Sequence, residues 1–142
     1  MTSTNPSPWF DRPMRWAQLT LVENDPLQYD VHFWLDYFKR IKADGACLSA
    51  GGCTAYYPTE IPLHHRTPWL GDGDPLGELI QGCRELDMVV IVRTDPHAMR
   101  QDAFDAHPEW AAVDAEGNPR RHWAMPELWV TCAHWDPITS TL

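Results

Sequence analysis

The chain has 142 residues, 44% of them hydrophobic, which is enough to form one domain with a buried core. Its formal net charge of −9 excludes a surface that attracts phosphate groups, and no basic run is longer than Arg120-Arg121, so we expect no nucleic-acid partner. No apolar run is long enough to span a bilayer, and residues 1–13 have neither the basic nor the apolar part of a signal peptide. We therefore expect no membrane association and a cytoplasmic location.

The first βα unit follows a lead-in that we assign to residues 1–14. "RWAQLTLVE", residues 15–23, predicts a strand. Asp30 is a typical N-cap, and apolar residues then recur at helical spacing as far as Ile41. We expect Gly45 to end this helix as the C′ residue.

The second unit begins at once with a predicted strand over residues 46–52, and a long loop follows it. Asp74-Pro75 then has the cap and first-turn residues of a second helix. Its helix leads into "MVVIVRTDPHAMR", residues 88–100, in which five apolar residues precede a polar cluster. An unbroken apolar run predicts a strand buried on both faces of a parallel sheet.

The region after residue 100 predicts a small hairpin between Trp110 and Trp123, with its turn at Glu116-Gly117-Asn118. "ELWVTCA", residues 127–133, predicts a fourth strand.

The alternation of strands and helices predicts an α/β fold with a parallel sheet. The loops after the strands are long and those before them are short, an asymmetry that fits a (β/α)₈ TIM barrel and also a doubly wound sheet. No G-x-G-x-x-G follows the first strand, which disfavours a dinucleotide-binding fold, and we expect the barrel. Because a barrel needs about 250 residues, we expect residues 15–142 to be the N-terminal half of a barrel domain, about the first four βα units, truncated from a longer protein. The alternative is a homo-oligomer in which two copies complete each other.

Polar residues follow the predicted strands, at the edge where the active sites of barrels lie. Glu23 follows the first strand, and Asp95 and His97 follow the third. We expect these three side chains to converge on one site, where Asp95 and Glu23 are the candidate catalytic carboxylates and His97 a substrate-binding residue. The alternative is that Asp95 caps its own loop and His97 is merely solvated.

The long loop after the second strand carries His64 and His65. Neighbouring histidines in an extended loop point in opposite directions, so we expect one imidazole to hydrogen-bond a ligand while the other packs. The alternative is that they form hydrogen bonds within the loop. A metal site made of His64, Asp95 and His97 is a second hypothesis, which would make the protein a metal-dependent hydrolase. The sequence has no H-E-x-x-H, and we expect neither a metal nor another cofactor.

Aromatic residues are concentrated in the predicted loops, and aromatic rings bind the C–H faces of sugars. We take Tyr57, Trp69 and Trp129 as candidate substrate-binding residues. For Trp110 and Trp123, which flank the hairpin, we expect a packing role over the mouth of the barrel.

Four segments together resemble a known family: "RWAQLTLVENDP", "YYPTEIPLHHRTPWLGDGDPLGELI", "MVVIVRTDPHA" and "HPEWAAVDAEGNPRRHW". They are similar to the N-terminal part of barrel-type glycoside hydrolases related to α-L-fucosidases and to β-galactosidases that carry a trimerisation domain. The resemblance covers about residues 14–133.

The resemblance implies a carbohydrate substrate and hydrolysis of O-glycosidic bonds by two carboxylates. The segment "TCAHWDP" departs from the family pattern because it lacks an Asn-Glu pair, and we do not assign Asp136 as the nucleophile. We therefore expect the isolated chain to lack part of the catalytic apparatus. A third hypothesis is a non-catalytic sugar-binding fragment that is stable only as a dimer.

Overall fold

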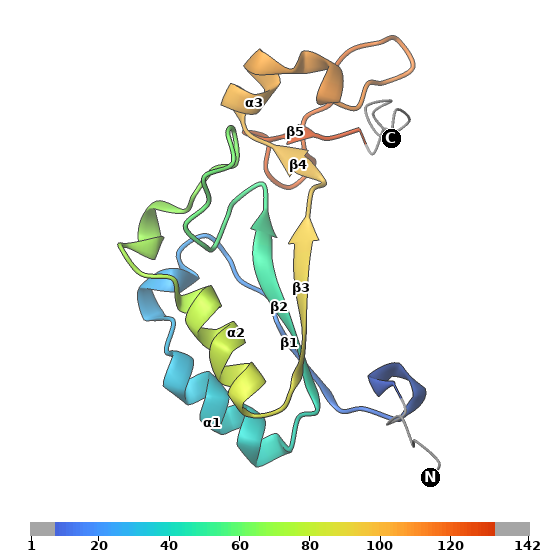
Figure 1. The fold of residues 1–142 in the computed structure, drawn as a ribbon. Coiled ribbons are helices and arrows are strands. Elements are labelled where there is room, and N and C mark those ends of the chain that lie inside the picture. The colour runs from blue at the N-terminus through green and yellow to red at the C-terminus, as the bar shows by residue number, and fades with distance from the viewer. Residues whose placement is uncertain (1–7, 133–142) are drawn as a thin grey trace.

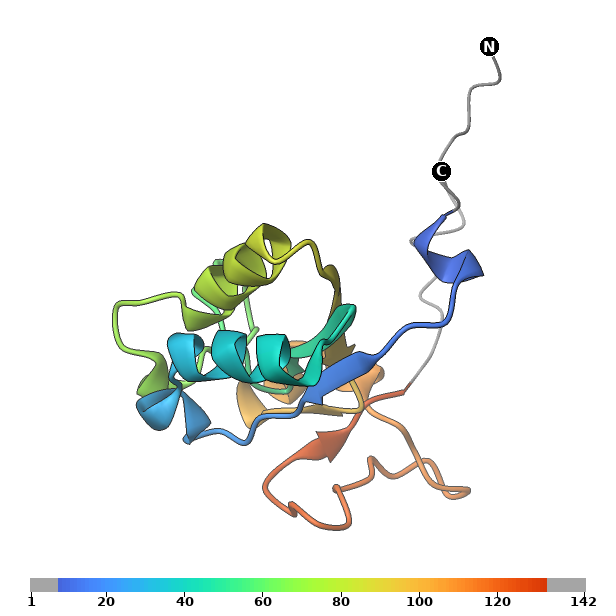
Figure 2. The ribbon, with the colours of Figure 1, turned by 90° about the horizontal axis from the view of Figure 1, so that it is seen from below.

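A computed structural model describes residues 8–132, in which two helices pack on one three-stranded parallel sheet. Figure 1 shows the sheet in the order β1-β2-β3 with α1 and α2 beside it, and Figure 2 shows both helices on the same side of the sheet. The elements, in chain order, are η1 (Trp9–Asp11), β1 (Trp16–Leu19), η2 (Asp25–Gln28), α1 (Val31–Ile41), β2 (Gly45–Gly52), η3 (Pro68–Leu70), α2 (Pro75–Glu85), β3 (Val89–Asp95), β4 (Ala98–Met99), α3 (Gln101–Ala106), η4 (Pro108–Trp110) and β5 (Trp129–Val130).

Both predicted helix starts are confirmed. The Asp30 carboxylate accepts a hydrogen bond from the Phe33 N–H at 3.0 Å, and that of Asp74 accepts one from the Gly77 N–H at 2.9 Å. Each bond satisfies a donor that the first turn of a helix leaves without a partner.

The predicted end of the first helix is wrong. Lys42, not Gly45, adopts the left-handed conformation that ends α1, with φ 52°. Gly45 is instead the first residue of β2, where a Cβ atom would lie 2.7 Å from the indole of Trp16. The glycine is needed for this close contact between strands and not for a turn.

The core lies between the sheet and the two helices. Alternate residues of β2 point toward the helices, and Ala46, Leu48 and Ala50 are buried there with Leu79 of α2 and Phe38 of α1. The opposite face of the sheet faces the inside of the partial barrel.

The prediction that the third strand is buried on both faces is wrong for part of its length. Ile91 and Val92 are 43% and 47% exposed. Within the described residues β3 pairs with β2 alone, and α1 and α2 cover neither its free edge nor the second face of the sheet.

The predicted fourth strand is also different. Within residues 127–132 only Trp129–Val130 form a strand, and this β5 pairs antiparallel with β4 instead of joining the parallel sheet. A parallel strand needs a crossover of a dozen or more residues that returns the chain to the starting edge. Residues 96–132, which we call the extension, make no such return and stay beyond the carboxyl end of β3, with the six-residue α3 among them (Figure 1).

The extension contains the predicted hairpin. The Gly117 N–H donates to the Asp114 carbonyl at 3.1 Å, Gly117 has φ 88°, and Val113 bridges to Pro119 in antiparallel fashion. The fold is thus the partial TIM barrel that the sequence predicts, with the extension added after its third strand.

Candidate functional site

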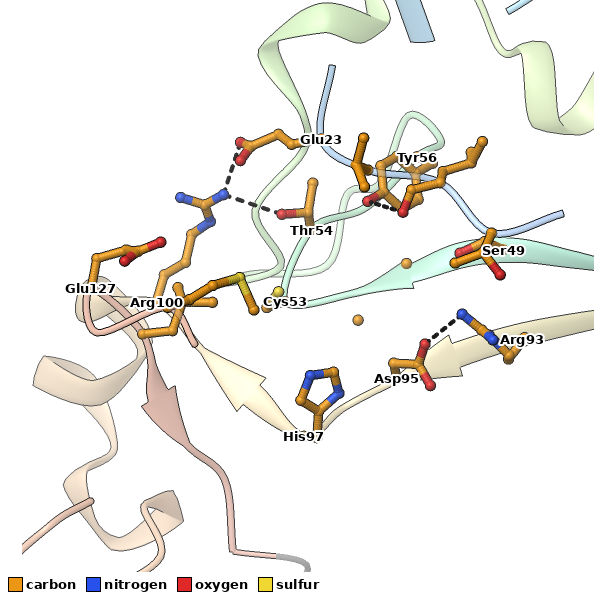
Figure 3. A pocket seen from close by; sticks show the side chains of 17 residues that line it. Glu23, Ser49, Cys53, Thr54, Tyr56, Arg93, Asp95, His97, Arg100 and Glu127 are labelled. Atoms are coloured by element: carbon orange, nitrogen blue, oxygen red, sulfur yellow. Dashed lines mark hydrogen bonds and ion pairs between the residues drawn. The ribbon is translucent and has the colours of Figure 1, made fainter. Parts of the chain in front are cut away.

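A cavity of about 280 Å³ lies where the carboxyl ends of β1, β2 and β3 meet the extension. Figure 3 shows its side chains, which come from all three strand ends and from the extension on the other side. Its polar and charged lining residues are Thr20, Glu23, Ser49, Thr54, Tyr56, Arg93, Asp95, His97, Arg100 and Glu127. The predicted convergence of Glu23, Asp95 and His97 at one edge of the sheet agrees with this arrangement.

Glu23 makes contacts with three other residues through its side chain and its backbone. Its Oε1 accepts a hydrogen bond from Arg100 Nη2 at 2.8 Å and lies 3.3 Å from Nε2 of His65. Its backbone carbonyl accepts a bond from the Thr67 hydroxyl at 2.7 Å. Glu23 therefore fixes the loop after β2 and the extension relative to the end of β1.

Asp95 ends β3 and faces Arg93, whose Nη2 lies 2.8 Å from its Oδ2. A register shift between Ser49 and Gly51 sets Gly52 opposite Asp95. A Cβ atom on Gly52 would lie 2.1 Å from the Asp95 carbonyl oxygen, so only glycine allows β2 to approach the end of β3 this closely.

His97 follows Asp95 and points into the cavity in Figure 3. Its ring lies 5.5 Å from that of the buried His122, whose Nδ1 accepts hydrogen bonds from two backbone N–H groups, those of Ala124 and Met125. His122 thus anchors the segment that brings Met125 and Glu127 to the cavity.

Tyr56 lies behind the polar residues, and its hydroxyl donates to the Leu21 carbonyl at 3.1 Å. Burial raises the pKa of Tyr56 to about 12. The Tyr56 hydroxyl therefore stays protonated at neutral pH and connects β1 to the loop after β2.

Five of the eight predicted substrate-binding residues do not line this cavity. His65 contacts it through Glu23, whereas His64 bonds within its own loop, with its Nδ1 3.4 Å from the Tyr57 hydroxyl and 3.3 Å from that of Thr59. Trp69 is 46% exposed in η3. The residues outside the cavity are Tyr57, His64, His65, Trp69 and Trp129.

The two faces of the Trp129 ring are already occupied. Phe104 stacks on it with 3.8 Å between ring centroids, and the Arg121 guanidinium lies 3.4 Å from its centroid. Two groups this close to one ring lie on opposite faces, so no face is left for a sugar. The interpretation of Trp129 as a sugar platform is corrected by this packing.

Two arginines of the cavity, Arg93 and Arg100, are not among the predicted site residues. Both belong to the same run of sequence as Asp95 and His97, and their position after the apolar run Met88 to Val92 is the signal that indicates them. Each has a buried Nε atom without a hydrogen-bond partner in the described residues. Because both guanidinium groups contact carboxylates, the cavity presents paired charges and hydroxyl groups together, which suits a ligand rich in hydroxyls.

The metal hypothesis is not supported. Within residues 8–132 no three His, Cys, Asp or Glu side chains are placed to hold a metal ion. His64 borders a different cavity from Asp95 and His97, which separates the three proposed ligands. Asp136 and the end of the predicted fourth strand lie outside the described residues. No helix among the described residues combines the length and the apolar character needed to cross a bilayer.

The comparisons with solved structures agree with the barrel fold. The chain is similar to α-L-fucosidase isoenzyme 2 from Paenibacillus thiaminolyticus, with a TM-score of 0.63 and 17% identity over 85% of this chain and 19% of that one. It is also similar to an α-amylase from Lactobacillus plantarum, with a TM-score of 0.53 and 16% identity over 83% of this chain and 31% of that one. The chain thus spans less than a third of the length of either protein.

At these identities the two structures establish the fold alone. A comparison with curated proteins found no match. The sequence comparison is more specific, because the family described as "Hypothetical glycosyl hydrolase 6" matches residues 30–140. This match covers most of the chain, including α1, α2 and α3 and all the described strands but the first. The chain belongs to the family of hypothetical glycosyl hydrolases 6.

Proposed function

We propose that the cavity binds one sugar unit of a carbohydrate substrate, and that the complete barrel hydrolyses the O-glycosidic bond of that unit with a pair of carboxylates. The observation that carries this proposal is the convergence of Glu23, Asp95 and His97 at the carboxyl ends of parallel strands, the edge where barrel enzymes bind their substrates. The family assignment supports a sugar as the ligand.

Asp95 and His97 are the residues that we propose to contact sugar hydroxyls. A carboxylate accepts hydrogen bonds only, whereas an imidazole can both donate and accept, so together they can bind neighbouring hydroxyls of one ring. Arg93 holds Asp95 in place from the adjacent position on the same strand face. Glu23 has a positioning role, since its Oε1 is shared between Arg100 and His65.

The isolated chain is expected to bind sugars without hydrolysing them. Glycoside hydrolysis needs one carboxyl group that donates a proton and a second carboxylate on the other side of the bond. Glu23 accepts a hydrogen bond from Arg100, and Asp95 forms an ion pair with Arg93, so neither is placed as a free proton donor. The remaining machinery is proposed to come from the part of the barrel that these 142 residues do not include.

Isothermal titration of the chain with L-fucose, D-galactose and D-glucose tests the proposal. At least one of them should bind, and Asp95→Asn should weaken that binding by about tenfold or more, which corresponds to about 1.4 kcal/mol. Glu116→Gln is a matched control, because it also removes one carboxylate but lies in the exposed hairpin away from the cavity. Nitrophenyl glycosides of the same sugars should show no turnover.

Two outcomes count against the proposal. If none of the three sugars binds, or if Asp95→Asn binds as the unchanged chain does while remaining folded, the cavity is not the sugar site. Robust turnover of a nitrophenyl glycoside by the isolated chain would show that this chain already contains a catalytic pair.

A further inference from the structure

A second cavity, of about 240 Å³, adjoins the first one. The two share three wall residues, Gly52, Cys53 and Arg100. The other walls of the second cavity come from the loop after β2 and from the extension, and they are mostly apolar: Ile61, Pro62, Leu63, His64, Ala98, Met99, Ala103 and Trp110. The two cavities are therefore neighbours, as two subsites for adjoining rings of one oligosaccharide would have to be.

Trp110 supplies an aromatic wall that the first cavity lacks. The first cavity contains one aromatic ring besides the histidine, that of Tyr56, which is buried and bonded to Leu21. Trp110 is 41% exposed, and His107 stacks on its ring with 3.9 Å between centroids and 8° between planes. Stacking of this kind occupies one face of the indole and leaves the other for a ligand.

The loop opposite Trp110 is held rigidly. The Ile61 N–H donates to the Thr59 hydroxyl at 3.1 Å, and the His64 N–H donates to the Ile61 carbonyl at 3.2 Å. Leu63 has φ 62°, a conformation that costs free energy for a leucine and that these bonds maintain. The strained backbone presents the exposed side chains of Ile61 and Leu63 at the second cavity.

His64 gives this cavity a polar group. Its Nδ1 lies within reach of two hydroxyl groups, those of Tyr57 and Thr59, and the Thr59 oxygen already accepts the Ile61 N–H. If Nδ1 accepts from these hydroxyls, the neutral imidazole carries its proton on Nε2. Nε2 forms no hydrogen bond within the described residues and is then a donor for a ligand hydroxyl.

We propose that the second cavity is a subsite for the next sugar ring of an oligosaccharide, with Trp110 stacking on the C–H face of that ring and His64 donating to one of its hydroxyls. The inference rests on the proposed function, because it places the first ring in the cavity of Asp95 and His97. Apolar walls with one aromatic platform and one hydrogen-bond donor fit a sugar ring, whose faces are apolar and whose rim is polar.

The test compares mono- and disaccharides by isothermal titration of the full chain. The pairs are D-galactose with lactose, D-glucose with maltose and cellobiose, and L-fucose with the disaccharide 2-O-α-L-fucosyl-D-galactose. A disaccharide should bind at least about tenfold more tightly than the monosaccharide of its pair. Trp110→Ala should remove this gain and leave the monosaccharide affinity within about twofold, as befits the loss of a contact made only by the second ring.

Trp123→Ala is the matched control, since Trp123 is 90% exposed and lines neither cavity, and it should leave both affinities unchanged. Trp110→Phe keeps a smaller aromatic ring and should retain part of the gain in disaccharide affinity. This second variant keeps the test decisive if the Trp110→Ala chain does not fold.

The outcomes separate the two proposals. If a monosaccharide binds but no disaccharide binds more tightly, or if Trp110→Ala and Trp110→Phe keep the full gain, the subsite is overturned while the first cavity stands. If no sugar binds at all, both proposals fail.

Discussion

Glu23 and Arg100 form an ion pair across 77 residues of sequence, with 2.8 Å between Oε1 and Nη2. Arg100 also donates to the Thr54 hydroxyl at 3.1 Å, so one guanidinium joins the end of β1, the end of β2 and the extension. In Figure 3 these three groups form one corner of the cavity. The pair is the contact that places the extension over the strand ends.

Replacing Arg100 by Met should therefore destabilise the chain. The pair is partly exposed, so solvent screening limits its contribution, and we expect a loss of about 1 kcal/mol in the free energy of unfolding. Lys39→Met is the control, because it breaks the more exposed Asp36–Lys39 pair of 3.7 Å on α1 and should cost less than about 0.5 kcal/mol. Urea unfolding measures both variants. Equal losses would show that the Arg100 contacts do not stabilise the extension.

Local signals in the sequence predicted the βα units well. Asp30 and Asp74 cap their helices through bonds to residues three positions away, and such contacts can be recognised from the sequence alone. The end of α1 was missed because Lys42 takes a conformation that favours glycine. The next glycine, Gly45, does not end the helix; a glycine is needed there because the Trp16 indole, on a neighbouring strand, lies where a Cβ atom would be.

The site was predictable where it depended on strand ends and unpredictable where it depended on the extension. Glu23, Asp95 and His97 converge because parallel strands end at one edge. By contrast, the antiparallel pairing of β4 and β5 decides that Arg100 reaches Glu23 and that Trp129 is packed between Phe104 and Arg121. No periodicity in the sequence reports that pairing, since each of these strands has only two residues.

The glycine next to Asp95 gives a second prediction. Gly52→Ala would bring a Cβ atom to 2.1 Å from the Asp95 carbonyl oxygen, a backbone atom that cannot move aside as a side chain can. We expect a loss of about 2–3 kcal/mol in the free energy of unfolding and a weakened sugar site. Gly73→Ala is the control, since its nearest neighbour would be 3.9 Å away. If denaturant unfolding gave the same midpoint for both variants, the close approach of β2 and β3 would be wrong.

The ends of the two long helices give a third prediction. Lys42 and Asp87 both have positive φ, of 52° and 57°, and both are exposed. Glycine adopts this conformation without a steric cost, so Lys42→Gly and Asp87→Gly should each stabilise the chain by about 0.5–1 kcal/mol. Lys39→Gly, inside α1, should instead destabilise it by about 1 kcal/mol. If thermal unfolding showed all three variants changing stability in the same direction, the left-handed conformation of Lys42 and Asp87 would be wrong.

Tyr56 gives a prediction for alkaline pH. Burial raises the pKa of Tyr56 to about 12, above the value of about 10 in an unfolded chain, so the folded state binds this proton more tightly. The resulting stabilisation is fully present below about pH 10 and is lost as the pH rises toward 12, reaching a loss of about 1 kcal/mol near pH 11.

Tyr56→Phe should reduce this loss, because the variant has no hydroxyl to ionise at that position. At neutral pH the same variant should be less stable by about 1 kcal/mol, since the Leu21 carbonyl loses its donor. The two stability curves, from urea unfolding between pH 7 and 11.5, should therefore approach each other as the pH rises. Tyr37→Phe is the control, because the Tyr37 ring is 38% exposed on α1, and its curve should run parallel to that of the unchanged chain. If the Tyr56→Phe curve also ran parallel to that of the unchanged chain, the Tyr56 hydroxyl would not be held by burial and by Leu21. The segment after β1 and the loop after β2 would then be joined at the cavity by Glu23 and Thr67 alone.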